Sequence, residues 1–108
     1  MFKIFATLYA NQNKVHAQIE NHYFYNKCFL ETDNWILENI EIIKDIPGII
    51  LQGQRDQIYP WENAAELHAC WPNSAFLLIP NAGHSSREAE IKKALIQATE
   101  DIKIKLRA

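Results

Sequence analysis

Two short apolar runs, each ending in a polar loop, constrain the fold of this 108-residue chain more than any other feature. Residues 48–51 and 75–79 are apolar without interruption, which is the pattern of strands covered on both faces. A helical stretch, residues 61–71, lies between them. Strand, helix and strand in this order predict two parallel strands joined by a crossover helix, so we expect an α/β protein.

The loops that follow the two runs carry an acid and a base. Asp56 follows the first run, and His84 follows the second, directly after Gly83. Loops at the carboxyl ends of parallel strands meet at one edge of the sheet, where such folds place their chemistry. In serine hydrolases a carboxylate orients the histidine that takes the proton of the nucleophile, and in α/β-hydrolases the acid precedes the histidine. The spacing alone leaves a second interpretation open, an aspartate in a turn and a histidine beside a glycine.

Gly83 has a predicted mechanical role, because a residue without Cβ lets the loop turn tightly ahead of the histidine. After the loop, Ser85 and Glu88 have the spacing of a capping box. A stripe at helical spacing then predicts a long C-terminal helix with solvated remaining faces: Ile91, Leu95, Ala98, Ile102 and Leu106.

Helices are also predicted ahead of the first strand. Residues 2–19 have helical character, with a possible break in the polar patch 11–14. The aromatic residues at 22–25 are expected to pack under a neighbouring layer. Asp33 is expected to cap a helix that ends before Pro47, because the residue before a proline avoids helical dihedral angles.

Composition narrows the classes of partner. The net charge is −2, with 11 basic and 13 acidic residues and no run of either sign, so we expect neither nucleic-acid nor membrane-surface binding. No segment has the length of a membrane span. Cys28 and Cys70 lack metal-ligand spacing and are predicted to be reduced thiols of a cytoplasmic protein, Cys70 as a small buried residue. No spacing among His16, His22 and His68 matches a metal site, so no metal is predicted, and His68 is expected on a polar helix face.

Four stretches of the sequence resemble the proline iminopeptidases, serine aminopeptidases with the α/β-hydrolase fold. The resemblance runs from about Val15 to about Thr99, in the order of that family, and covers only the C-terminal part of the much longer family enzyme. Its stretches are QIENHYF at 18–24, IPGIILQGQRD at 46–56, ENAAELHACWP at 62–72 and PNAGHS at 80–85.

The resemblance implies the C-terminal part of an α/β-hydrolase fold, with two parallel strands, flanking helices and an incomplete sheet. Residues 1–45 would be a helical remnant of the connection between cap and core, and residues 46–108 the βαβα part of the core. Asp56 would be the catalytic acid, His84 the general base, and Glu20 a ligand of the α-amino group of a peptide with N-terminal proline. No metal or organic cofactor is implied.

The nucleophile of such an enzyme is not among these residues. The serines are Ser74, Ser85 and Ser86, and none lies in a Gly-x-Ser-x-Gly turn; the family's glycine-rich oxyanion loop is missing too. We therefore expect the chain to be inactive alone and to pair with a missing N-terminal half or with itself through its sheet edge. A non-catalytic truncated fragment or association module remains an alternative. Another α/β-hydrolase, such as an esterase, is disfavoured by the stretch at 19–24.

Two residues depart from the family pattern. Arg55 stands where an aromatic residue usually precedes the acid, and it is expected to depress the pKa of the acid or to compete for its hydrogen bonds. Tyr59 stands where the family often has a cysteine, which predicts weaker inactivation by mercurials.

Overall fold

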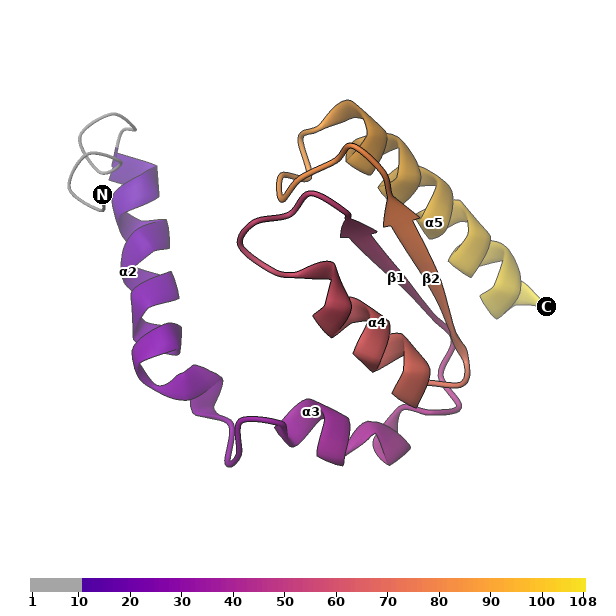
Figure 1. The fold of residues 1–108 in the computed structure, drawn as a ribbon, viewed down its shortest axis with the longest axis horizontal. Coiled ribbons are helices and arrows are strands. Elements are labelled where there is room, and N and C mark those ends of the chain that lie inside the picture. The colour runs from indigo at the N-terminus through magenta and orange to yellow at the C-terminus, as the bar shows by residue number, and fades with distance from the viewer. Residues whose placement is uncertain (1–10) are drawn as a thin grey trace. The chain divides into compact units, whose positions relative to one another are not determined.

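The computed structural model describes residues 11–108, which fall into two compact units that divide between Trp35 and Ile36. Helix α2 (Asn11–Tyr25) and the 3-10 turn η1 (Lys27–Phe29) belong to the first unit, and α3 (Trp35–Glu38) spans the boundary. The second unit contains η2 (Ile40–Ile42), β1 (Gly48–Gly53), α4 (Trp61–Cys70), β2 (Ser74–Ile79) and α5 (Ala89–Arg107). Figure 1 shows the two strands and the two longer helices of this unit. None of the helices in residues 11–108 combines the length and apolarity that crossing a membrane requires.

In the first unit, α2 runs without a break through the polar patch 11–14, the predicted place of a possible interruption. No glycine or proline interrupts the patch, so the helical hydrogen bonds continue. The predicted helical residues 2–10 lie outside the described part of the chain. The expectation that residues 22–25 are covered is wrong for Tyr25, which is 91% exposed. Tyr23 and Phe24 are also exposed, although the Tyr23 ring makes an edge-on contact with Phe29.

The long helix predicted after Asp33 is also wrong, since α3 is only one turn long. Asn39 leaves helical geometry at φ −113° and ψ 16°, and η2 follows. The sequence beyond it is rich in β-branched isoleucine, which loses side-chain freedom in a helix. Burial of Ile40 in the second unit then stabilises the short turn instead.

The two strands pair in parallel, from Gly48 opposite Ser74 to Gly53 opposite Ile79, with α4 as the crossover between them. This confirms the predicted pair of parallel strands with flanking helices. Within residues 11–108 the sheet contains β1 and β2 alone, so it is open at both edges. Both polar loops leave the same end of this sheet (Figure 1).

Helix α4 packs on one face of the sheet and α5 on the other. On the α4 side, the His68 ring stacks on Phe76 at 5.7 Å, and the Trp71 ring fills the space where a side chain of Gly48 would lie. On the α5 side, Ile49 lines a shallow groove with Leu95, Ala98 and Ile102.

Coverage of the strands is less complete than their apolar runs predict. Helix α5 packs mainly against β1, and Leu77 of β2 stays 39% exposed. The stripe of α5 is buried at its start, where Ile91 is 6% exposed, but Leu106 near its end is 68% exposed. The apolar runs predict strands that are buried on both faces. Here a single helix lies on each face of the sheet, and this leaves part of the strands exposed.

Candidate active site

Backbone hydrogen bonds fasten the loop after β1 to the loop after β2. The N–H of Gln54 donates to the carbonyl of Ile79 at 3.0 Å, and the N–H of Arg55 donates to the carbonyl of Ala82 at 2.8 Å. Ala82 is 2% exposed, the most buried of the core residues. The relative position of the two loops is therefore set by backbone geometry, close to where each carries its polar side chain.

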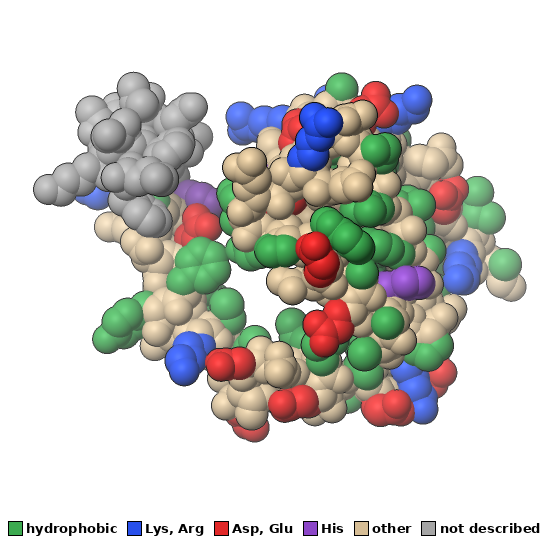
Figure 2. Space-filling view, viewed as in Figure 1, with side chains coloured by type: hydrophobic (Ala, Val, Ile, Leu, Met, Phe, Trp, Pro, Cys, Tyr) green, Lys and Arg blue, Asp and Glu red, His purple; other side chains and the backbone are tan. Residues whose placement is uncertain are grey.

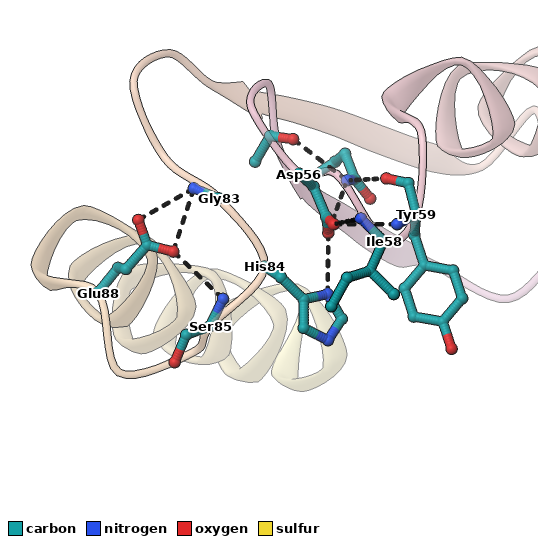
Figure 3. Close-up of polar contacts among 9 residues, drawn as sticks. Asp56, Ile58, Tyr59, Gly83, His84, Ser85 and Glu88 are labelled. Atoms are coloured by element: carbon teal, nitrogen blue, oxygen red, sulfur yellow. Dashed lines mark hydrogen bonds and ion pairs between the residues drawn. The ribbon is translucent and has the colours of Figure 1, made fainter. Parts of the chain in front are cut away.

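Asp56 is held at the turn of the first loop. Its Oδ1 accepts the backbone N–H groups of Ile58 and Tyr59, both at 2.9 Å, so the carboxylate itself closes the turn. The side chain is only 7% exposed. Figure 3 shows the carboxylate between these backbone groups and the imidazole of His84. The turn fixes one oxygen and leaves the other, Oδ2, facing the second loop.

His84 meets that oxygen, with Nδ1 at 3.0 Å from Oδ2 of Asp56. Because an ionised carboxylate only accepts hydrogen bonds, Nδ1 carries the proton and Nε2 of the neutral ring has a free lone pair. The imidazole is 47% exposed, and the ring of Tyr59 lies 5.3 Å away on one side (Figure 3). The structure thus brings Asp56 and His84 together in the geometry that a histidine base and its orienting acid require.

The carboxylate of Asp56 stays ionised far into the acidic range. Burial opposes its ionisation, but hydrogen bonds from the Tyr59 N–H, from His84 and from the Ile58 N–H outweigh this and lower its pKa to about 2. Arg55, expected to depress this pKa, is not among the groups that do so. Its backbone N–H instead donates a hydrogen bond to the carbonyl oxygen of Ala82.

This shift predicts a pH dependence of stability. The folded pKa of about 2 lies below the ordinary value of 3.8, so the unfolded chain binds the proton more readily. Stability from Asp56 is present above about pH 4 and is lost as the pH falls towards 2. Urea midpoints measured between pH 2 and pH 6 should fall with acid, and Asp56→Asn should flatten that fall. Asp101→Asn, on the exposed face of α5, is the control; an equal fall in Asp56→Asn contradicts this prediction.

The second loop is supported from behind by Glu88. Its carboxylate accepts the N–H of Gly83 at 3.0 and 3.1 Å and the N–H of Ser85 at 3.2 Å, on both sides of His84 (Figure 3). The predicted capping box is therefore half right. Glu88 reaches back to Ser85, but α5 begins only at Ala89, and the Ser85 hydroxyl accepts the N–H of Arg87 instead of capping the helix.

Removing this support should loosen the histidine loop. Glu88→Ala leaves the partly buried N–H of Gly83 and the exposed N–H of Ser85 without their acceptor and is expected to lower the free energy of unfolding by about 1–2 kcal/mol. Glu88→Gln keeps one acceptor oxygen, so its loss should be smaller. Urea unfolding measures both, with the exposed Glu90→Ala at the start of the same helix as control. A loss in Glu88→Ala no larger than in Glu90→Ala contradicts the role.

The role predicted for Gly83 is wrong. Its φ is not positive, and the left-handed residue in this loop is Asn81, at φ 63°. The tight position is Gly53, where a Cβ would lie 2.1 Å from the carbonyl oxygen of Gly83 and 2.7 Å from that of Ala82. A glycine is needed at Gly53 because the two loops touch at this residue. The sequence pattern predicted the requirement at Gly83, on the loop after the other strand.

The other residues singled out in the sequence lie elsewhere. Glu20, on α2 of the first unit, has its carboxylate 3.7 Å from Nε2 of His16. Cys28 and Cys70 are free and exposed, so the buried position predicted for Cys70 is wrong; it lies on an exposed face of α4. His68 is half-buried against Phe76 and does not lie on a polar face.

His68 also contacts a serine, with its Nδ1 at 2.8 Å from the Ser74 hydroxyl. That hydroxyl donates to the carbonyl of Trp71 at 2.8 Å, so the histidine supplies the proton here and cannot activate the serine. Ser74 also begins β2, at the opposite end of the sheet from His84. The contact therefore has a structural role. No group of three potential ligand residues within 11–108 is arranged to hold a metal ion.

No protein-family model matches the chain, but curated relatives do. A probable proline iminopeptidase of Leptolyngbya boryana is 46% identical over 84 residues, which are 78% of this chain and 26% of that protein. The proline iminopeptidase of Xylella fastidiosa (strain 9a5c) is 43% identical over 84 residues, 78% of this chain and 27% of that protein. The proline iminopeptidase of Arabidopsis thaliana is 40% identical over 87 residues, which are 81% of this chain and 23% of that protein. The chain thus spans about a quarter of the length of these relatives and matches their C-terminal part, which confirms the resemblance.

Proposed function

We propose that this counterpart of the C-terminal quarter of proline iminopeptidases supplies the acid, Asp56, and the general base, His84, of a serine aminopeptidase site. The nucleophile and the oxyanion donors would come from residues outside these 108. The observation that carries the proposal is the 3.0 Å contact between Nδ1 of His84 and Oδ2 of the buried Asp56 carboxylate. It leaves the second imidazole nitrogen free to take a proton.

In this mechanism, Nε2 of His84 removes the proton of a serine hydroxyl as the oxygen attacks the carbonyl carbon of an N-terminal proline residue. The resulting imidazolium is stabilised by the ionised Asp56. His84 then returns the proton to the leaving amine, which departs as the shortened peptide. Water, activated by the same nitrogen, hydrolyses the acyl-enzyme and releases free proline.

Glu20 is proposed to bind the substrate ammonium. An exopeptidase must recognise the free α-amino group, and a carboxylate is the natural partner of a cation. The Glu20 carboxylate lies 3.7 Å from Nε2 of His16, one turn earlier on the same helix. We further propose that residues 1–45 are a helical remnant of the connection between cap and core and that residues 46–108 are the C-terminal βαβα part of the core.

The partner proposed is the N-terminal part of a chain of this family. In residues 11–108 the buried apolar core consists of Ile40, Ala82 and Ile91, and apolar side chains reach the surface of the second unit (Figure 2). The open edge of β1 offers unpaired backbone groups, and the groove beside Ile49 offers an apolar surface on which a partner could pack. An added parallel strand would satisfy both needs.

A chimaera tests the proposal. The C-terminal segment of the Xylella fastidiosa enzyme that matches this chain is replaced by this chain, and hydrolysis of a prolyl arylamide is measured. We expect activity that the N-terminal part alone lacks. A folded chimaera without activity contradicts the proposal, and one that cleaves aryl esters but not the prolyl arylamide favours an esterase.

The 108-residue chain alone is expected to show no hydrolysis, because a base without a nucleophile has nothing to acylate. Measurable release of arylamine by the purified chain contradicts this. Light scattering of the same sample should show self-association through the open edge; a well-folded monomer contradicts the need for a partner there.

A further inference from the structure

Gln52, on β1, directs its side-chain amide into the loop that carries Asp56. Its Nε2 lies 3.0 Å from the carbonyl oxygen of Tyr59, 3.2 Å from that of Gly53 and 3.3 Å from Oδ2 of Asp56. One side chain on the strand therefore reaches both ends of the loop and the carboxylate in its middle. The two amide hydrogens can serve two of these three acceptors well at one time.

The contact with Asp56 completes the surroundings of the carboxylate. Oδ1 accepts the N–H groups of Ile58 and Tyr59, while Oδ2 faces Nδ1 of His84 and Nε2 of Gln52. A carboxylate offers about four lone-pair sites, so each has a donor when the Gln52 amide gives one of its two hydrogens to Oδ2. Rotation of the carboxylate about its χ2 angle would break several of these bonds at once. Of the four donors, only Gln52 and His84 are side chains, and only Gln52 stands on the rigid strand.

We propose that Gln52 is a positioning residue, which holds residues 53–59 closed and keeps Oδ2 of Asp56 turned towards His84. It acts through Asp56 and needs no contact with substrate. The inference rests on the roles proposed above for Asp56 and His84. Its structural content, however, is tested in the isolated chain without any peptidase activity.

The first test needs no substitution. In NMR hydrogen-exchange measurements on the 108-residue chain, the side-chain amide protons of Gln52 are expected to exchange about tenfold more slowly than those of Gln57, which is exposed on the same loop. Slow exchange of the Gln52 amide protons supports the proposed hydrogen bonds of Gln52 to residues 53–59. Equal exchange rates for Gln52 and Gln57 overturn it, whatever any variant does.

The second test uses variants of matched shape. Gln52→Met keeps the length of the side chain without its donors, and Gln52→Glu replaces the donors by acceptors. In a ¹³C titration of the Asp56 carboxyl carbon, Gln52→Met should raise the pKa by about half a unit to one unit, and Gln52→Glu by more. The Nδ1–H resonance of His84 should also broaden or move. Gln57→Met, in the same loop, should change neither.

An unchanged Asp56 titration and His84 resonance in folded Gln52→Met overturn the proposal; if Gln52→Met does not fold, the exchange rates decide. In the active chimaera, Gln52→Met should lower kcat about tenfold with KM unchanged, because the base is misaligned while substrate binding is kept. An inactive chimaera with altered Asp56 titration would reject the proposed function and leave the positioning role standing.

Discussion

His84→Ala in the chimaera is expected to lower kcat by about 10⁶-fold, and Asp56→Asn by about 10⁴-fold. The alanine removes the group that is proposed to take the proton of the nucleophile. The asparagine keeps the shape of the acid but offers Nδ1 of His84 a different partner, so the proton can move to Nε2 and block the base. Steady-state kinetics with a prolyl arylamide measures both losses, and KM should change little.

Asp101→Asn and Glu100→Gln are suitable controls, because both positions are exposed on α5 and distant in sequence from the two loops. Their kcat should stay within about twofold of the unsubstituted chimaera, as is usual for surface changes. A folded His84→Ala chimaera that retains a tenth of the activity would contradict the assignment of the base. Equal losses in the controls would show that the chimaera, not the site, had been damaged.

Gly53→Ala is the substitution expected to damage the fold most. Its Cβ would lie 2.1 Å and 2.7 Å from two backbone carbonyl oxygens of the histidine loop, far inside van der Waals contact. Backbone cannot rotate away as a side chain can, so the two loops must separate. We expect a loss of about 3 kcal/mol in the free energy of unfolding, at the upper end for overpacking. The contact between Asp56 and His84 should be lost with it.

Gly83→Ala is the matched comparison for Gly53→Ala. A Cβ at Gly83 meets first an oxygen of the Glu88 side chain at 3.2 Å, and a side chain can yield by a few tenths of an ångström. Its loss of stability in urea unfolding should stay below about 1 kcal/mol. A larger loss in Gly83→Ala than in Gly53→Ala would contradict the view that the loops meet at Gly53.

The sequence predicted the strand–helix–strand unit because its signals are local and agree with one another. Two continuous apolar runs, a helical stretch between them and polar breaks after each run leave one simple arrangement. The same topology brought Asp56 and His84 to one edge of the predicted sheet, since consecutive parallel strands end there, but their assignment as acid and base came from the family resemblance. The capping signal at Ser85 found the correct pair of residues but placed the helix start too early.

Features that depend on partners distant in sequence could not be predicted. The need for glycine at Gly53 arises from carbonyl groups of another loop, and the support from Glu88 arises from backbone N–H groups around His84. Apolar runs indicated strands covered on both faces, but a run cannot show whether the covering elements belong to the same 108 residues. Leu77 remains partly exposed for that reason.

The sequence does contain a signal from which the role of Asp56 in closing its own turn could have been predicted. An aspartate that is followed two and three residues later by free backbone N–H groups is typical of a side-chain-closed turn. The lowered pKa follows from that turn and from His84, and not from the neighbouring Arg55 that the sequence suggested. Gln52 gave no signal, because an amide on a strand has many possible partners.

Labelling with a fluorophosphonate tests the central claim most directly, that Asp56 and His84 serve a serine from outside these 108 residues. In the active chimaera, peptide mapping should place the label on one serine of the N-terminal part, and His84→Ala should abolish labelling. The chain alone should remain unlabelled. A label on Ser74, Ser85 or Ser86, in the chimaera or in the chain alone, would contradict the claim.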